Sequence, residues 1–468
     1  MKLRFAPSPT GFLHVGGART AIFNLLHAHR YGGTMLLRIE DTDVERSKQH
    51  HAEQIVSSLQ WLGVSWDDGP IYQSDRLDRY RSRAEELVGA GKAYRCYCTV
   101  EELENERAIA EKAGIAYRYS GRCRTLPETG AVARNQEHTI RFKVVPGSID
   151  FHDLIRGDVH FEADLIDDFV LLRSDGYPTY HLSVVVDDID MEITHVARGD
   201  DHLSNTPKHI LLFRAFGAEP PLFAHLPLIL GPDRKRLSKR TGATSVEEYR
   251  DLGIVPAALF NFLMLLGWSP GRDRELITHE EAEKTFDLSD VNKAPAVFDV
   301  EKLLWMNGQY LMRMTPEEIY PQLIAFLGDA PPPLEMIREA IELTKARGRT
   351  LREIASNLQP FMSDAFDYEP DAVRKHLKDG EVTGRMKELR DVLAAAEPFD
   401  VATTERVLRQ LSEQRGVGAA KYIHPLRLAL TGRGASPPIF DVAAVLGKDQ
   451  TLQRLDRFIA RIPELMGA

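Results

Sequence analysis

The chain has 468 residues, enough for two to four domains, and its 43% hydrophobic content is that of an ordinary globular protein. The formal net charge of −10 counts mildly against a nucleic-acid partner, although it leaves room for a local basic surface. Nothing at the N-terminus resembles a signal peptide, and no apolar run approaches membrane-spanning length. Three cysteines in so long a chain argue against a disulfide framework, so we expect a cytoplasmic protein.

The N-terminal segment predicts a strand, a rigid loop and a helix. Residues 3–6 are an apolar run, and the prolines and glycine of residues 7–11 then prevent regular structure. Apolar residues recur with helical spacing from Ala18 to Leu26. The first turn of this helix therefore follows His14.

This helix start has the features of a phosphate site. A helix N-terminus offers free N–H groups and partial positive charge. Gly16 and Gly17 lack a Cβ, so a flat ligand such as a purine could lie against the backbone, and His14 could donate a hydrogen bond to a phosphate. The alternative is a tight turn with packing glycines and a surface histidine.

The next segments alternate between strands and helices. An apolar strand, Met35–Ile39, ends in the acids that begin at Glu40, and strand ends of this kind gather at the ligand-binding edge of an open sheet. Residues 96–173 mix short strands with a polar helix and indicate an α+β insertion. The remaining predictions are helices at 54–62, 76–88 and 100–113, strands at 182–186, 193–196 and 226–230, and a helix capped by Asn205 or Thr206 with Pro207 at its first position.

A cationic loop follows the last predicted strand. Five basic residues occur within the seven positions 234–240, bracketed by Gly231 and Gly242. Such a loop could close over a polyphosphate, and the alternative is a solvated run of charge. From Val246 onward nearly every segment is predicted to be helical.

Together, the helix start at His14 and the cationic loop at 234–240 resemble the paired signatures of class I aminoacyl-tRNA synthetases. His14–Gly17 stands where that class has its HIGH motif, and Arg236–Arg240 where it has KMSKS. Further stretches are similar to glutamyl-tRNA synthetases, densely from Lys2 to about Leu311 and more loosely beyond. These stretches are 4–10, 38–43, 175–181 and 193–196.

The resemblance implies an α/β fold with a Rossmann-like parallel-sheet catalytic domain, an α+β insertion and an all-α C-terminal half. The expected boundaries are 1–95 and 182–240 for the catalytic domain and 96–181 for an acceptor-binding insertion. A helical stem-contact domain is expected at 241–315 and a helical anticodon-binding region at 316–468.

The reaction implied is ATP-dependent formation of glutamyl-adenylate, followed by transfer of the glutamyl group to the terminal ribose of tRNA. The attacking carboxylate is already ionised at pH 7, so no general base is needed. His14 would position the phosphates, Lys239 would stabilise the charge that grows on them, and Ser238 and Arg240 would hold the loop. Mg²⁺ is expected on the phosphates. The residues expected to bind ATP are Pro9, Thr10, His14, Gly16, Gly17, Arg236, Lys239 and Arg240.

The family's amino-acid site maps onto Arg4, Ser8, Glu40, Tyr180 and Arg198. Arg4 is assigned to the side-chain carboxylate, Glu40 to the α-ammonium, and Tyr180 and Arg198 to the rest. For an arginine outside such a motif, a surface ion pair would be the simpler reading. His202 is expected near the site without an assigned role.

Cys96, Cys98 and Cys123 resemble the zinc-bearing insertion of some members. The family's histidine two residues after the third cysteine is replaced here by Thr125, and Tyr119 could ligate instead, as in the related glutamyl-Q enzymes. Three thiolates suit tetrahedral zinc, but an incomplete set is also what a decaying site retains.

The segment 350–361 resembles the anticodon-facing helix of the family, with Gln359 where members restricted to tRNA Glu commonly carry Arg. A Gln amide both donates and accepts, so it can suit C or G, whereas Arg only donates. The hypothesis is a non-discriminating enzyme that also charges tRNA Gln.

Three alternatives remain for the function. A shortened glutamyl-Q-type enzyme would lack the C-terminal region after Leu311, and an inactive RNA-binding paralogue would not need His14, Ser238 and Lys239. A small adenylyltransferase would not need so long a helical half. The expected partners are tRNA Glu, L-glutamate and ATP, with no membrane, and the expected state is a monomer.

Overall fold

The computed structural model describes residues 1–43, 46–115, 117–125, 137–237, 244–271 and 273–467. They form two compact units. The first contains residues 1–249 and 259–299, and the second contains 250–258 and 300–468.

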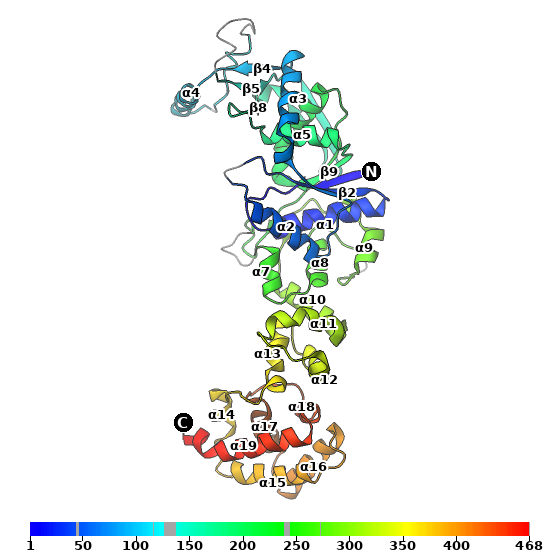
Figure 1. Cartoon of the computed structure of the whole chain (residues 1–468), viewed down its shortest axis with the longest axis vertical. Coiled ribbons are helices and arrows are strands. Elements are labelled where there is room, and N and C mark those ends of the chain that lie inside the picture. The colour runs from blue at the N-terminus through cyan, green and yellow to red at the C-terminus, as the bar shows by residue number, and fades with distance from the viewer. Residues whose placement is uncertain (44–45, 116, 126–136, 238–243, 272, 468) are drawn as a thin grey trace. The chain divides into compact units, whose positions relative to one another are not determined.

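A parallel sheet lies at the centre of the first unit (Figure 1). Strands β1 (Lys2–Phe5), β2 (Thr34–Ile39) and β3 (Asp68–Tyr72) pair in that order and run parallel. Strands β9 (His195–Gly199), β10 (Leu222–Leu226) and β6 (Ser148–Asp153) are also parallel neighbours, with β7 (Gly157–Glu162) antiparallel at the edge. The two groups meet where the Thr194 N–H donates to the Lys2 carbonyl at 2.9 Å. The predicted Rossmann-like sheet is therefore confirmed.

Parallel strands need crossover connections, which here are mainly helices. These helices are α1 (Val15–Arg30), α2 (Gln49–Trp61), α3 (Leu77–Gly89), α5 (Tyr180–Asp190) and α6 (Thr206–Ala215). The shorter elements are η1 (Gln73–Arg76), η2 (Ala163–Leu165), η3 (Asp200–Asn205), α7 (Val246–Asp251), α8 (Pro256–Met264), α9 (His279–Thr285) and η4 (Leu288–Asp290), with β11 (Ile229–Leu230) paired to β12 (Ala296–Val297).

The insertion contains a small antiparallel sheet of β4 (Ala93–Cys96), β5 (Thr139–Phe142) and β8 (Val170–Leu172). Its polar helix α4 (Val100–Lys112) starts at a capping box between Thr99 and Glu102, and none of its residues is buried. Ile140 and Phe142 of β5 pack in the same apolar core as Leu36 of β2. The insertion and the central sheet thus share one core.

Two local predictions were wrong, and a third holds only in part. Residues 182–186 are helical, as part of α5, because the apolar run is buried on all sides and shows no polar period that would reveal a helix. The predicted strand 226–230 is divided at Pro227, which lacks the N–H that a ladder needs. Helix α6 begins at Thr206 with Asn205 at its N-cap position and Pro207 in its first turn, as predicted, but the Asn205 side chain makes no capping hydrogen bond.

The second unit is helical, as predicted. Its helices are α10 (Val300–Arg313), α11 (Pro316–Leu323), η5 (Ile324–Phe326), α12 (Leu334–Lys345), α13 (Leu351–Met362), α14 (Pro370–His376), α15 (Val382–Ala394), α16 (Val401–Gln414), α17 (Ala420–Thr431), α18 (Ile439–Leu446) and α19 (Lys448–Gly467). Helices α14 to α19 enclose one apolar core, in which Arg454 is fully buried and donates to the Leu430 carbonyl at 2.6 Å.

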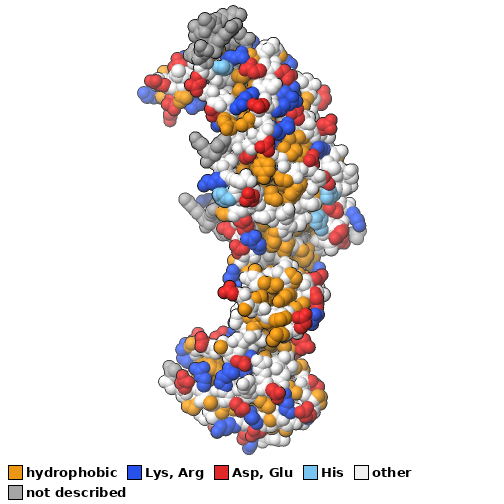
Figure 2. All heavy atoms as spheres, in the orientation of Figure 1, with side chains coloured by type: hydrophobic (Ala, Val, Ile, Leu, Met, Phe, Trp, Pro, Cys, Tyr) orange, Lys and Arg blue, Asp and Glu red, His pale blue; other side chains and the backbone are white. Residues whose placement is uncertain are grey.

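The surface agrees with the modest net charge. On the face drawn in Figure 2, acidic and basic side chains are interspersed. Among the helices of the described residues, none combines the length and the apolar character needed to cross a membrane.

Candidate active site

A cavity of about 660 Å³ lies at the carboxyl ends of β1, β2, β9 and β10. This is the edge at which open parallel sheets bind ligands. It brings together nine of the residues predicted from the sequence: Arg4, Ser8, His14, Gly16, Gly17, Glu40, Tyr180, Arg198 and Arg236. His202 also lies in its wall.

Other predicted residues are placed differently. Pro9 lines a smaller neighbouring pocket with Asp41 and Ser74, and Thr10 is exposed and is not part of the described wall of the main cavity. Ser238, Lys239 and Arg240 lie outside the described residues. The residues that flank them, Leu237 and Thr244, both line the cavity.

His14 is the N-cap of α1. Its Nδ1 accepts the Gly16 N–H at 3.0 Å, so in the neutral ring the proton is on Nε2, which is therefore a donor. A Cβ on Gly16 would lie 3.3 Å from that Nδ1, so even a small side chain there would crowd the ring. Desolvation in the cavity wall and the nearby Arg236 hold the pKa of His14 below its usual value.

The residues that follow the cationic loop contact the same helix start. The Val15 N–H donates to the Thr244 carbonyl at 2.9 Å, and His14 forms a β-bridge with Ser245. Thr244 and Ser245 thus lie beside the helix N-terminus, although they are far from it in the sequence.

Arg198 is a buried cation in the cavity wall. Its guanidinium donates to Thr206 Oγ1 at 2.8 Å, to the Tyr180 hydroxyl at 3.2 Å and to His225 Nε2 at 3.2 Å. Within the described parts of the chain, no carboxylate forms an ion pair with it. Burial lowers the pKa of Arg198. A buried guanidinium without a carboxylate partner keeps its positive charge uncompensated, which favours an anionic ligand in the cavity.

Arg4 and Glu40 belong to a buried charge cluster with Arg38 and Asp188. Arg4 Nε donates to Asp188 Oδ1 at 3.2 Å, and Arg38 Nη1 donates to the same oxygen at 2.8 Å. Arg38 Nη2 also donates to Glu40 Oε1 at 3.2 Å. Burial raises the pKa of Glu40, against the opposing effect of Arg38 and Arg4.

Arg19 was not assigned from the sequence but lines the cavity, with 3% of its surface exposed. It donates to the Leu266 carbonyl at 3.1 Å and to the Pro227 carbonyl, while its Nε has no described partner. Burial lowers the pKa of Arg19 to about 10. The sequence did not identify Arg19, because a polar residue within a predicted helix is ordinarily placed on the exposed face, and a single sequence does not distinguish a buried arginine from an exposed one.

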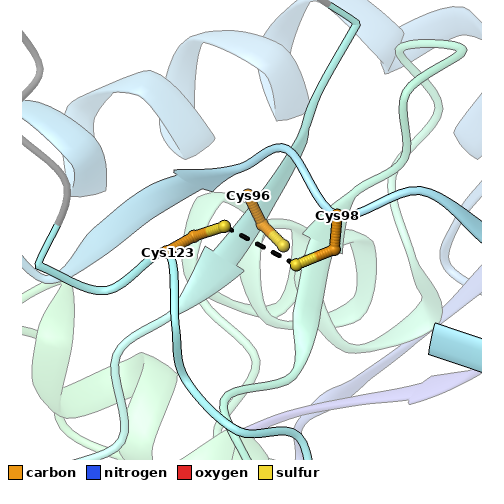
Figure 3. A group of neighbouring side chains, drawn as sticks. All are labelled: Cys96, Cys98 and Cys123. Carbon is orange, nitrogen blue, oxygen red and sulfur yellow. Dashed lines mark hydrogen bonds between the residues drawn. The ribbon is translucent and has the colours of Figure 1, made fainter. Parts of the chain in front are cut away.

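The three cysteines lie together in the insertion, and their side chains point toward one another in Figure 3. Cys98 Sγ lies 3.6 Å from Cys123 Sγ. The Tyr119 hydroxyl lies 3.2 Å from Cys96 Sγ and 3.5 Å from Cys98 Sγ. Burial would raise the pKa of Cys96, but hydrogen bonds, that of Tyr119 foremost, outweigh it and lower the pKa to about 7.

Gln359 is exposed on α13 of the second unit, and its amide makes no hydrogen bond to a described side chain. Its neighbours Ser356 and Asn357 accept from Arg433, at 3.1 Å and 3.3 Å. The amide is therefore available to a ligand.

Two family models match the chain. Residues 1–305 match the catalytic domain of class I tRNA synthetases of the E and Q type, and residues 317–459 match an anticodon binding domain. A glutamate–tRNA ligase of Koribacter versatilis is 48% identical and covers 98% of this chain and 97% of its own. One from Thermodesulfovibrio yellowstonii is 46% identical and covers 98% and 99%.

A solved structure gives the same result. The glutamate–tRNA ligase of Elizabethkingia meningosepticum, in complex with its amino acid, superimposes with a TM-score of 0.89 at 35% identity and covers 99% of each chain. With the cavity at the sheet edge, the helical second unit and these full-length similarities together, the chain belongs to the class I aminoacyl-tRNA synthetase family and, within it, to the bacterial glutamate–tRNA ligases.

Proposed function

We propose that the cavity holds ATP and glutamate side by side and joins them into glutamyl-adenylate, from which the glutamyl group passes to the 3′-terminal adenosine of tRNA Glu. The observation that carries this proposal is Arg198, a buried cation without a described carboxylate partner, in the same cavity as Glu40. The Arg198 guanidinium complements a carboxylate, and the Glu40 carboxylate complements an ammonium. A carboxylate and an ammonium are the charged groups that every amino acid carries.

Within this site, Arg4 would bind the side-chain carboxylate and Glu40 the α-ammonium, while Tyr180, Arg198 and Ser8 hold the rest. The Nη1 side of Arg4 makes no hydrogen bond to a described residue, which leaves part of the guanidinium available for a ligand. Tyr180 is fixed between two partners, because its hydroxyl accepts from Arg198 and lies 3.0 Å from His202 Nδ1.

The ATP side begins at the α1 N-terminus. Gly16 and Gly17 leave the backbone open, and His14 Nε2–H is available to a phosphate oxygen. Lys239 would stabilise the charge that grows on the α-phosphate and pyrophosphate, with Ser238 and Arg240 holding the loop and Arg236 binding ATP. Mg²⁺ is expected on the phosphates, which supply the hard oxygen ligands it prefers.

Aminoacylation tests the proposal directly. The purified chain should attach labelled glutamate to tRNA Glu with release of AMP, and Arg198→Met should lower kcat/KM for glutamate by roughly 10–100-fold, the cost of losing a charged hydrogen-bonding partner. Arg214→Met, on the exposed face of α6, is the matched control and should change little. Failure of the folded wild-type chain to charge tRNA Glu would overturn the proposal.

We propose that residues 96–181 contact the acceptor end of the tRNA, 241–315 its stem and 316–468 its anticodon, and that the enzyme is a cytoplasmic monomer. The anticodon-domain match at 317–459 supports the last of the contacts. The low cysteine content, three in 468 residues, is typical of a reducing compartment.

We further propose that Cys96, Cys98, Cys123 and Tyr119 bind one zinc ion. Tetrahedral ligands at ordinary bond lengths lie about 3.8 Å apart for two sulfurs and about 3.5 Å apart for a sulfur and an oxygen. The Cys98–Cys123 distance of 3.6 Å and the Cys98–Tyr119 distance of 3.5 Å fit those edges. Zinc would stabilise the insertion. Tyr119→Phe should make the zinc easier to remove with a chelator without abolishing zinc binding.

Finally, we propose that Gln359 reads the last anticodon base and permits charging of tRNA Gln as well as tRNA Glu. Glutamate anticodons end in C and glutamine anticodons in G, and losing one good base-edge pair costs ~1–3 kcal/mol of discrimination. Both transcripts should be charged within about a hundredfold of each other under identical salt, and Gln359→Arg should raise the preference for tRNA Glu. A wild-type preference beyond that range would rule this reading out.

A further inference from the structure

Asp188 is a buried carboxylate, 3% exposed, that does not itself line the described wall of the cavity. It lies on α5 and accepts from Arg4 twice, with Nε at 3.2 Å and Nη2 at 3.5 Å. It also accepts from Arg38 Nη1 at 2.8 Å. One carboxylate therefore contacts guanidinium groups from β1 and β2.

These contacts fix the orientation of two residues of the proposed amino-acid site. Because Asp188 occupies the Nε–Nη2 edge of Arg4, the Nη1 side is the part left for a ligand. Arg38, fully buried, is held by Asp188 through Nη1 and donates from Nη2 to Glu40 Oε1 at 3.2 Å. Asp188 is thus connected to Glu40 through a single intervening side chain.

We propose that Asp188 is a positioning residue for glutamate: it orients Arg4 toward the side-chain carboxylate of the substrate and, through Arg38, orients Glu40 toward the ammonium. The inference rests on the roles proposed above for Arg4 and Glu40. One buried side chain would thus set the distance between the two charged ends of the amino-acid site.

A purely structural role is the competing explanation. Buried ion pairs lose hydration when they form, and replacing them by packed apolar side chains is often neutral for stability or even favourable. A cluster whose arginine and glutamate both reach the cavity is therefore better explained by the ligand than by the fold. Asp188 lies outside the described cavity wall and contacts a residue of that wall, which is the arrangement expected of a side chain that supports binding groups.

The neighbouring Asp187 is the matched control. It is equally buried on the same helix, and it accepts from Gln73 at 2.7 Å, Arg76 at 2.8 Å and Tyr80 at 2.9 Å. None of these three donors is part of the described cavity wall, and Asp187 Oδ2 lies 3.7 Å from Arg38 Nε, an ion pair too long for a hydrogen bond. Asp187→Asn should therefore lower stability and act far less on the amino-acid site than Asp188→Asn.

The test is pyrophosphate exchange with tRNA present, with the KM for glutamate and for ATP measured separately. Asp188→Asn should raise the KM for glutamate by roughly 10–100-fold, as expected when a buried charged group loses its partner, and should leave the KM for ATP within about threefold. Asp187→Asn should keep both values close to those of the wild type, even if both variants unfold at lower temperature. Equal glutamate KM values for the two variants would overturn the proposal.

A double-mutant cycle separates this inference from the proposed function. If Asp188 acts largely through Arg4, the Arg4→Ala/Asp188→Asn variant should be little worse than Arg4→Ala alone. Losses that multiply would show that Asp188 acts independently of Arg4. If Arg4→Ala itself leaves the glutamate KM unchanged, the proposed role of Arg4 and the inference both fail.

Asp188→Asn removes the ion-pair partner of Arg4 and one of the partners of Arg38, and could fold poorly. Arg38→Met/Asp188→Asn removes one charge of each sign, so the net charge of the buried cluster is unchanged. This charge-balanced variant still deprives Arg4 and Glu40 of their partner, so its glutamate KM should rise as well. A folded variant with a wild-type glutamate KM would overturn the positioning role.

Discussion

His14 has one role that the structure shows and one that we propose, and a pair of substitutions can separate them. Its Nδ1 caps α1 by accepting the Gly16 N–H at 3.0 Å, and its Nε2–H would serve the phosphates. Asparagine at this position keeps an oxygen where Nδ1 stands but has no atom at the place of Nε2. Alanine has neither.

The magnitudes follow from these contacts. Asn is among the best N-cap residues, so His14→Asn should unfold at nearly the wild-type temperature, whereas His14→Ala should lose ~1 kcal/mol of helix capping. Both variants lack the Nε2 donor, so both should form glutamyl-adenylate ~10²–10³-fold more slowly. Equal catalytic loss with unequal stability is the expected signature.

Pyrophosphate exchange with tRNA present measures the rate, and thermal unfolding of the same preparations measures stability. A His14→Asn variant that exchanges at the wild-type rate would show that capping is the only function of His14. Slow exchange in His14→Ala alone would have the same meaning.

Three further outcomes are expected. Lys239→Ala should fold normally and slow adenylate formation by ~10²–10³-fold, and near-normal turnover would contradict its proposed role. Elemental analysis should find about one zinc per chain, lost in Cys98→Ser; a metal-free, fully active preparation would mark the cysteines as remnants. Burial lowers the pKa of His27 to about 4, of His181 to about 3 and of His202 to about 4, so the unfolded chain binds more protons than the folded chain below pH 6.5. These three histidines should therefore leave stability undiminished above that pH, and the unfolding temperature should fall as the pH is lowered toward 4. The fall should be less steep in His27→Asn, and an equal pH dependence in the two proteins would contradict this.

Much of the fold was predictable because its signals are local. The strand at β2, the helix after His14 and the polar helix α4 each carry a period or a cap within a few residues. Helix α5 was mistaken for a strand because burial on every side erases that period, and its valines favour strands when taken alone.

The candidate site divides in the same way. Residues inside dense motifs, such as Arg4 and Glu40, could be named from the sequence. Asp188 and Arg19 could not, because their importance comes from contacts with distant segments: Arg4 lies 184 positions from Asp188, and Leu266 lies 247 from Arg19. No single-sequence pattern reports pairings that only the folded chain creates.

The pairing of β4 with β5 has a consequence for how the segment that contains Cys98 and Cys123 is attached to the sheet. Cys96 and Thr139 are direct partners in that ladder, so residues 97–138 leave and re-enter the sheet at adjacent positions. In connectivity they are one long hairpin loop, and a turn of about two residues could close the same two strands. Because Cys98, Tyr119 and Cys123 all lie within this loop, metal binding could be gained or lost as a module while the strands that carry Arg4 and Arg198, and the strand that ends just before Glu40, keep their register.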